Sequence, residues 1–275
     1  MIFMEKEKSS FAIPVAIVIA GALIAVSLYF SNSGKPATNT GNTTGNTPSQ
    51  NVEVLSQDIN IRPIEASDHV LGSPGAAIVM VEYSDTECPF CKQFHGTMHR
   101  VIDAYGKDGT VSWVYRHLPL DNLHKKARNE AQATECAAKL GGNEKFWSYI
   151  DRLLEVTTSN DTLDPAKLPV IAKDVGLDQK AFVSCLSAND EAADIEADYQ
   201  EAVNAGGNGT PFSIIITKKK FDVLKVKDFI LAISQKNRLP VELFTVSNDG
   251  TKISMSGALP YEIVEQFIKM LQALK

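Results

Sequence analysis

Two cysteines that flank a Pro-Phe dipeptide, in the stretch TECPFCKQFH (86–95), are the residues of this chain best suited to chemistry. Cys88 and Cys91 could hold a metal ion, close a structural ring, or carry electrons by dithiol–disulfide exchange. They directly follow the apolar run AAIVMVEYSD (76–85). A strand is therefore expected to give way to a helix here, with Cys88 as the helix cap and Pro89 in the first turn.

A thiol at a helix N-terminus is chemically activated. Free amide groups and the positive end of the helix dipole stabilise the thiolate, and the thiol pKa can fall from ~8.5 to roughly 3.5–7.5. Cys88 is accordingly predicted to be the attacking thiol. Cys91, one helical turn further on, is predicted to be the less exposed resolving thiol that completes the exchange.

A zinc site is not favoured, because zinc needs four ligands and the chain has a single Cys-x-x-Cys pair. The other two cysteines, Cys136 and Cys185, lie singly in predicted helices. His95 and His99 are four residues apart on the helix that follows the pair, but His95 is interpreted as a polar helix-face residue. A purely structural ring is also disfavoured, since so short a loop constrains little of the unfolded chain. The pair is thus interpreted as a carrier of electrons that needs no metal or organic cofactor.

Cys136 and Cys185 form a separate question, with two answers open: two buried thiols or one disulfide. If the domain lies outside the cytoplasm, pairing is favoured, because unpaired buried thiols are a liability there. In the chain-entropy model, closing the long loop between them would stabilise the fold by about 4 kcal/mol. A structural disulfide is the preferred interpretation.

The elements that must position the pair follow from the hydrophobic pattern. Short apolar runs are predicted as strands at 77–83, 111–116, 213–217 and 252–256. The first run leads into a helix with apolar residues at three- and four-residue spacing, and a strand follows. This order predicts a βαβ unit and an α/β fold. An amphipathic helix that begins at Pro260 is expected to end the chain.

Between the second and third strands, residues 123–205 are predicted to form an all-helical insertion. Gly141-Gly142 is expected to end one helix and Asn143 to cap the next. Asp164 followed by Pro165 is an expected helix start, and Gly176 an expected end. A second segment, residues 218–246, contains a plausible short helix with Val226, Phe229, Ile230 and Ile233 on one face. It could reshape the substrate groove or pack as an extra layer, and a surface insertion is the preferred interpretation.

The N-terminal part of the chain is not typical of a globular domain. Residues 11–30, FAIPVAIVIAGALIAVSLYF, form an uncharged apolar run close to the ~20 residues that a membrane helix requires. Residues 31–51 are rich in Ser, Thr, Asn and Gly, which predicts a flexible linker. We expect a short cytoplasmic N-terminus (1–10), an uncleaved anchor, and a folded domain over 52–275. The alternative to the anchor is a cleavable signal peptide, whose apolar region would be shorter, ~7 to 15 residues. The net charge of -6 without a basic cluster argues against nucleic acid as a partner.

The chain from about residue 61 onward resembles the DsbA-like thiol:disulfide oxidoreductases of the thioredoxin superfamily. The resemblance is carried by HVLGSPGAAIVMVEYSDTECPFCKQFH (69–95), by GTPFSIII (209–216) and by SGALPYEIVEQFI (256–268). Its most specific element is the combination of Cys-Pro-Phe-Cys with a distant Thr-Pro. It implies a thioredoxin-like fold with a helical insertion, as in membrane-tethered bacterial members.

The resemblance also implies roles for residues outside the pair. Thr210-Pro211 would be a cis peptide beside the active site, whose backbone edge holds an extended substrate segment. Pro89 and Phe90 would also face the substrate, with Phe90 partly exposed. Glu82 would be a buried carboxylate that relays a proton to or from the resolving cysteine. The Pro-Phe dipeptide lacks the histidine of the most oxidising relatives, so a less extreme reduction potential is expected.

Together these inferences predict a monomeric oxidoreductase anchored in a bacterial cell membrane, with its catalytic domain on the extracytoplasmic side. It would act on cysteine-containing proteins, chiefly as a disulfide-forming oxidase, and a membrane redox partner would reset the pair. The alternatives are a membrane-anchored reductase or isomerase and a non-catalytic binding or chaperone module.

Overall fold

The computed structural model describes residues 53–274 of the 275-residue chain. These residues belong to one compact unit, Val52–Lys275. The predicted cytoplasmic N-terminus, membrane anchor and linker (1–10, 11–30 and 31–51) lie outside the described residues. Within residues 53–274, no helix combines the length and the apolar character that a membrane crossing demands.

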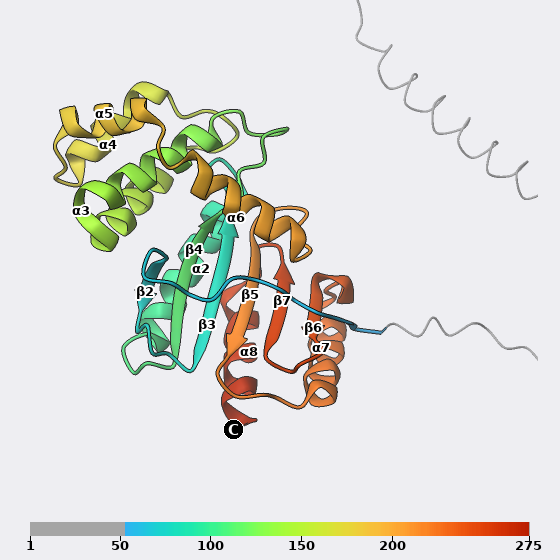
Figure 1. Ribbon diagram of the computed structural model, residues 1–275. Helices are drawn as coiled ribbons and strands as arrows, with labels where there is room; N and C mark the ends of the chain where they lie inside the picture. Colours follow the sequence, from blue (N-terminus) through green and yellow to red (C-terminus); the bar gives the residue numbers. More distant parts are fainter. Residues whose placement is uncertain (1–52, 275) are drawn as a thin grey trace, which may run out of the picture. The chain divides into compact units, whose positions relative to one another are not determined.

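The described part of the chain is built on a mixed sheet whose strand order is β1-β6-β7-β5-β3-β4-β2 (Figure 1). β3 lies inside the sheet, parallel to β4 on one side and antiparallel to β5 on the other. The strands are β1 (Leu55–Gln57), β2 (His69–Gly72), β3 (Ile78–Ser84), β4 (Val111–His117), β5 (Phe212–Thr217), β6 (Phe244–Ser247) and β7 (Lys252–Ser256). The four predicted strands are confirmed as β3, β4, β5 and β7.

Three strands, β1, β2 and β6, were not predicted. They have three or four residues each, and β1 is exposed along its whole length. Runs this short cannot display an alternating pattern that distinguishes a strand from a loop. They are strands because neighbouring strands pair with them: β1 and β7 pair with β6, and β2 pairs with β4.

The helices fall into two groups (Figure 1). Those of the insertion are α3 (Ala127–Val156), η1 (Pro165–Lys167), α4 (Leu168–Asp174), α5 (Gln179–Ala188) and α6 (Ala192–Asn204), and those outside it are α2 (Pro89–Tyr105), α7 (Val223–Asn237), η2 (Val241–Leu243) and α8 (Tyr261–Ala273). The connection β3–α2–β4 confirms the predicted βαβ unit. The long insertion between β4 and β5 is all-helical, as predicted.

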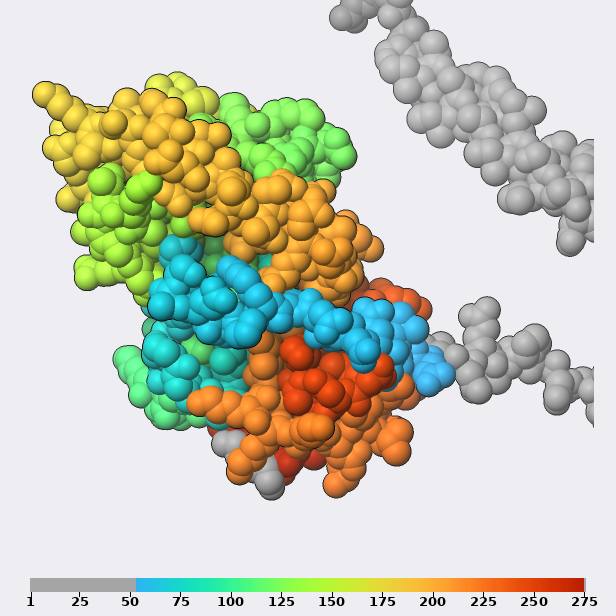
Figure 2. Space-filling model, in the orientation of Figure 1, coloured from blue at the N-terminus to red at the C-terminus, as the bar shows by residue number. Residues whose placement is uncertain are grey.

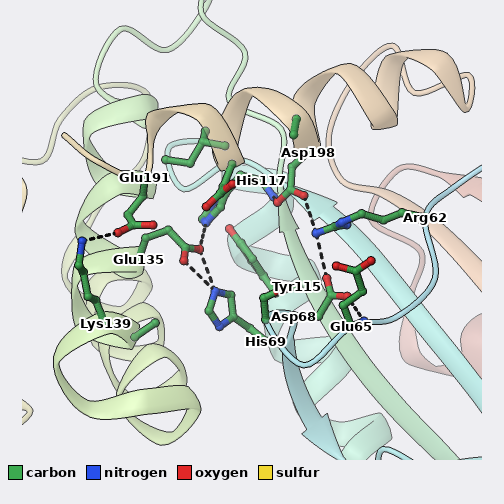
Figure 3. Close-up of a pocket in the computed structure, with 15 residues that line it drawn as sticks. Arg62, Glu65, Asp68, His69, Tyr115, His117, Glu135, Lys139, Glu191 and Asp198 are labelled. Carbon is green, nitrogen blue, oxygen red and sulfur yellow. Dashed lines mark hydrogen bonds and ion pairs between the residues drawn. The ribbon is translucent and has the colours of Figure 1, made fainter.

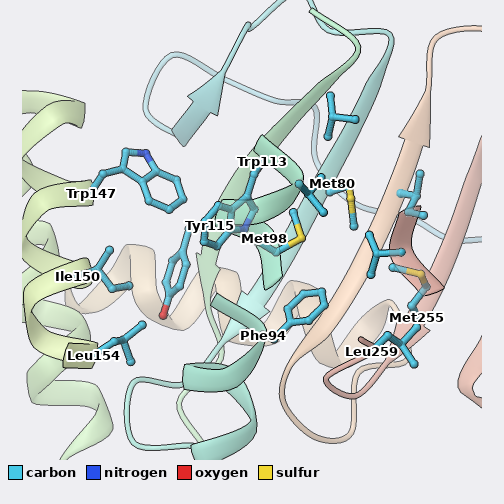
Figure 4. Close-up of a cluster of buried hydrophobic side chains, with 14 of the residues drawn as sticks. Met80, Phe94, Met98, Trp113, Tyr115, Trp147, Ile150, Leu154, Met255 and Leu259 are labelled. Atoms are coloured by element: carbon cyan, nitrogen blue, oxygen red, sulfur yellow. The ribbon is translucent and has the colours of Figure 1, made fainter. Parts of the chain in front are cut away.

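Two hydrophobic cores form because alternate side chains of β3 point to opposite faces of the sheet. Met80 packs in the larger core with residues of α2, α7 and α8, whereas Val81 packs in the smaller core with Ala202 of α6. Figure 4 shows the larger core, which extends from the sheet into the insertion. There Trp113 of β4 meets Trp147 of α3, with ring centroids 4.5 Å apart.

The N-terminal residues of the described chain lie on the surface (Figure 2). They pass between the helical insertion and the C-terminal elements and are fixed by ion pairs. Arg62, for example, pairs with Asp68 at 3.1 Å and with Asp198 of α6 at 3.0 Å. Asp68 also pairs with Arg116 of β4 at 2.9 Å, so this N-terminal segment (residues 53–68) ties the sheet to the last helix of the insertion.

The predicted helix boundaries inside the insertion hold at most positions. Gly142, with a φ of 72°, marks a kink between two helical stretches of α3, which requires the left-handed conformation that glycine adopts freely. Asp164 accepts a hydrogen bond from the N–H of Ala166, as expected of a cap. The prediction for Asn143 was wrong: its amide pairs with both backbone groups of Val70 on β2 instead of capping a helix.

A disulfide joins Cys136 of α3 to Cys185 of α5 across 49 residues, with Cα atoms 5.8 Å apart. Cys136 is fully buried and belongs to the larger core, and Cys185 packs against that core. The disulfide therefore links two helices inside the insertion and lies apart from the Cys88–Cys91 pair.

The interpretation of residues 218–246 as a surface insertion was wrong. The segment contains α7, whose residues Val226, Ile230 and Ile233 are buried. It also supplies β6, which carries the sheet beyond β7. The predicted apolar face of the helix was correct, but only the sheet beneath it reveals that this face is covered.

Candidate active site

Cys88 and Cys91 lie at the junction of β3 and α2. Pro89 occupies the first turn of α2, and Cys88 is the N-cap, with an extended backbone (φ -78°, ψ 121°). Both cysteines are free thiols in this structure. Cys88 retains 4% of its surface exposed, whereas Cys91 has none, so only Cys88 is open to attack by a partner.

The surroundings of Cys88 stabilise its thiolate and lower its pKa from 9.0 to about 6. The largest cause is a hydrogen bond from the thiol of Cys91, and the backbone N–H groups of Cys91 and Phe90 add to it, against the opposing effect of burial. These amides are among the unpaired donors at the start of every α-helix. The position of Cys88 in the local fold thus supplies its reactivity.

Cys91 is affected in the opposite direction. Burial raises its pKa well above 9.0, and the neighbouring charges of Cys88 and Glu82 raise it further. The backbone N–H of Asp85 points to its sulfur at 3.4 Å. Cys91 is therefore a protonated thiol whenever Cys88 is a thiolate, and it needs a base before it can attack.

A distant loop completes the surroundings of Cys88. The Thr210-Pro211 peptide is cis, and the carbonyl oxygen of Thr210 lies 3.5 Å from Sγ of Cys88. The hydroxyl of Thr210 is buried without a hydrogen-bond partner, so it is available to donate to the thiolate. Beside this loop, Phe90 is 61% exposed and Pro89 is also exposed. The thiol, the loop and the aromatic ring together border a surface that a peptide can reach.

Glu82 lies on β3 in register with Tyr115 of β4, so the two side chains share the sheet face on which Met80 packs. Glu82 is fully buried, and neither of its carboxyl oxygens has a hydrogen-bond partner. Burial raises its pKa to about 7, although Ser84 and Trp113 nearby oppose the shift. A carboxyl group with this pKa can both accept and release a proton near neutral pH.

Neither His124 nor Asp85 was assigned a role from the sequence. Asp85 is buried and accepts hydrogen bonds from the N–H of Leu120 (2.7 Å) and Glu87 (2.8 Å), and His124 faces it at 3.0 Å. Burial disfavours the His124 cation, but the bond to Asp85 outweighs it and raises the His124 pKa. The charge of His124 also interacts with Cys88, so this histidine helps to stabilise the thiolate.

A second missed feature links the insertion to the cysteine pair. Glu87, the residue before Cys88, is fully buried and accepts the N–H of Asp161 with its side chain and that of Asn160 with its carbonyl, both at 2.8 Å. Burial and Glu87 raise the pKa of Glu130 of α3 to about 9, so Glu130 is a neutral acid. The sequence did contain a signal for His124, because this residue follows the end of β4, the strand that lies beside β3. It contained no signal for Glu130.

The structure also contains a cavity of about 390 Å³ between β2, β4, α3 and α6 (Figure 3). Its charges satisfy one another: Glu135 accepts hydrogen bonds from His69 and His117, both at 2.8 Å. These two bonds outweigh burial and hold the pKa of Glu135 at about 2. No cysteine lines this cavity, and its ion pairs join the N-terminal segment to the insertion.

Comparison with known proteins bears out the interpretation of the fold. The family model described as thioredoxin matches residues 65–235. The crystal structure of Pseudomonas aeruginosa DsbA2 is similar, with a TM-score of 0.54 and 26% identity, over 76% of this chain and 97% of that one. Oxidised BdbD from Bacillus subtilis, at 21% identity and a TM-score of 0.52, covers 67% of this chain and 97% of that one and shares the fold.

A curated relative of another kind also matches. A protein named Na(+)/H(+) antiporter NhaA 3, from Salinispora tropica, is 36% identical over 144 residues, or 52% of this chain. The chain spans only 21% of that relative's length. With the family match over more than half of its length, this chain belongs to the thioredoxin family.

Proposed function

We propose that the protein forms disulfides in cysteine-containing proteins outside the cytoplasm. The observation that carries this proposal is the asymmetry of the pair: the Cys88 pKa is lowered to about 6, whereas that of Cys91 is raised. Stabilising the thiolate stabilises the reduced form of the pair, and this makes its disulfide a stronger oxidant.

The reaction begins with the Cys88–Cys91 disulfide. A substrate thiolate, having released its proton to solvent, attacks Sγ of Cys88, and the bond to Cys91 breaks. Cys91 leaves as a thiolate and takes a proton from Glu82. A second substrate thiolate then attacks the substrate sulfur of the mixed disulfide, and Cys88 leaves as a thiolate. Two electrons pass from the substrate to the pair, and the substrate gains one disulfide.

The cis Thr210-Pro211 loop would hold the substrate during this exchange. Its backbone lies beside Cys88, and an extended segment could pair with it as an added strand. The exposed ring of Phe90 offers an apolar contact next to the attacking sulfur. Binding would therefore depend mainly on the main chain of the substrate and only weakly on which side chains the substrate carries.

The proposed location is the outer side of a bacterial cell membrane, with residues 11–30 as a single anchor and the domain as a monomer. The apolar sequence of that segment supports an anchor. The Cys136–Cys185 disulfide is typical of proteins in oxidising compartments. Turnover would require a membrane redox partner that re-oxidises the pair.

The test is the reduction potential of the pair in the 275-residue chain, equilibrated in glutathione buffers and quenched by alkylation. Peptide mass spectrometry separates Cys88 and Cys91 from the structural pair Cys136 and Cys185. A potential of about -120 to -180 mV supports an oxidase. A value near the thioredoxin figure of about -270 mV would favour a reductase fed from the membrane.

Oxidation of a reduced two-cysteine peptide provides the second readout. The disulfide form should oxidise the peptide, and Cys88→Ser should abolish the reaction. If the pair does not cycle at all, yet the peptide still binds, the protein is a binding module. If only wrongly paired peptides are acted upon, it is an isomerase.

A further inference from the structure

Three side chains from two helices converge between α2 and α3, beside Trp113 of β4. Nε2 of His95 lies 2.6 Å, and Nε2 of His99 2.9 Å, from the same oxygen, Oδ1 of Asp151 on α3. The two ring nitrogens are 3.1 Å from each other. His95 is buried, so its interpretation as a polar helix-face residue was wrong.

Hydrogen bonds to Asp151 account for two of the three close contacts but leave the contact between the two ring nitrogens unexplained. An imidazole nitrogen presents one proton or one lone pair in the plane of its ring. Each Nε2 here has two close partners, the carboxylate oxygen and the other ring nitrogen. If both Nε2–H groups donate to the Asp151 oxygen, no proton lies between the two ring nitrogens, and their contact is not a hydrogen bond. One cation would accept a lone pair from all three atoms at once.

The spacing of the three atoms also suits a metal ion. Ligand atoms bonded at about 2.1 Å are about 3.0 Å apart on one face of an octahedron and about 3.4 Å apart in a tetrahedron. The two longer observed separations, 2.9 and 3.1 Å, match the octahedral spacing, and the shortest, 2.6 Å, would widen around a bound ion. Two imidazoles and one carboxylate select a transition metal such as Zn²⁺ over Mg²⁺ or Ca²⁺, which prefer oxygen ligands.

The surrounding residues hold the ligands in place and leave the group open to solvent. Trp113 of β4 contacts the rings of His95 and His99 edge-on, with centroids 5.0 and 5.4 Å away. The side chains of His99 and Asp151 are 36% and 43% exposed. Water could therefore fill the remaining coordination positions of a bound ion, as in sites that have three protein ligands.

We propose that His95, His99 and Asp151 form a binding site for a divalent transition metal, of the class of Zn²⁺. The site joins α2, which carries the cysteine pair, to α3 of the helical insertion. A bound ion clips the insertion to the redox helix and stabilises the folded state. The sequence shows only the two histidines, because Asp151 lies 52 residues beyond His99.

The test is titration of the metal-free 275-residue chain with Zn²⁺ by calorimetry. The pair is first oxidised to the Cys88–Cys91 disulfide, so that free thiols cannot bind the metal. One Zn²⁺ per chain is expected, with a rise in melting temperature. His99→Gln and Asp151→Ala should each weaken binding by about tenfold or more. Glu155→Gln is the matched control, because Glu155 is an exposed carboxylate on the same helix, 70% exposed.

Two results would overturn the site. One is uptake of less than one equivalent of Zn²⁺ by the oxidised chain. The other is equal affinity in the wild type, His99→Gln and Asp151→Ala, or equal weakening by Glu155→Gln. Circular dichroism shows whether each variant folds, and the visible spectrum of added Co²⁺ reports its ligands independently. That spectrum should change in His99→Gln and stay the same in Glu155→Gln.

Discussion

The carbonyl oxygen of Thr210 lies 3.5 Å from the sulfur of Cys88, although the two residues are 122 positions apart in the chain. The contact brings the loop before β5 to the start of α2. It places the attacking thiol against a backbone edge and next to a buried hydroxyl that has no other partner. Under the proposed function, this contact would place the bound substrate segment beside the reactive sulfur.

The thiolate of Cys88 should titrate near pH 6 in the reduced protein, as measured by ultraviolet absorbance of the thiolate. Cys91→Ala should raise this pKa, because the Cys91 thiol is the largest source of stabilisation. Thr210→Val should raise it by a smaller amount, since it removes one donor. Cys88→Ser should abolish the transition. A transition that persists in Cys88→Ser, or a midpoint near pH 9 in the wild type, would contradict this assignment.

Glu82→Gln should slow the step in which Cys91 resolves a mixed disulfide. Stopped-flow reaction of the reduced protein with oxidised glutathione separates this step from the initial attack by Cys88. Loss of the base should reduce the second rate by about a hundredfold or more. The wild-type rate should rise with pH through about 7, the pKa of Glu82, and the variant should lack that rise. The first step serves as the internal control and should keep its rate.

Glu82 should also lower stability as the pH increases. Its pKa is about 7 in the folded protein and 4.5 without burial, so its favourable contribution is complete below pH 4.5 and is lost as the pH rises through 7. The shift corresponds to about 3 kcal/mol at most. Denaturant unfolding of the reduced chain should show Glu82→Gln more stable than the wild type at about pH 8, with the difference shrinking at about pH 4. An unchanged difference between those pH values would refute the raised pKa.

Removing the structural disulfide should destabilise the protein without inactivating the pair. Replacement of Cys136 and Cys185 by Ala opens a loop across 49 residues, and the chain-entropy model predicts a loss of about 4 kcal/mol. Thermal and denaturant unfolding measure the loss, and peptide oxidation at low temperature checks activity. A loss below about 1 kcal/mol would mean that the unfolded insertion is already compact.

The α7 helix allows a test of whether residues 218–246 belong to the core. Ile230 is fully buried, whereas Leu224 on the same helix is 72% exposed. Ile230→Ala should reduce the free energy of unfolding by about 2–5 kcal/mol, because it leaves a cavity. Leu224→Ala is the matched control and should change it by about 0.5 kcal/mol or less. Similar effects of the two substitutions would contradict the packing of α7 described above.

The sequence by itself determined the features that depend on neighbouring residues. The Cys-x-x-Cys spacing after an apolar run predicted a strand-to-helix junction, with Cys88 at the cap, because capping involves only the first turn. Asp164-Pro165 marked a helix start for the same reason. The roles expected of Glu82 and Thr210 came from a resemblance to relatives, since neither residue shows its function locally.

Tertiary structure alone decided which distant groups meet. His124 reaches Asp85 because β3 and β4 are parallel and end at the same edge of the sheet. Asp151 meets His99 because α3 packs beside α2, and the short strand β6 exists because β1 and β7 pair with it. Burial, strand pairing and shifted pKa values arise from contacts between segments far apart in the chain. A local pattern of side chains indicates which face of a helix or strand is apolar, but it does not indicate which other element covers that face.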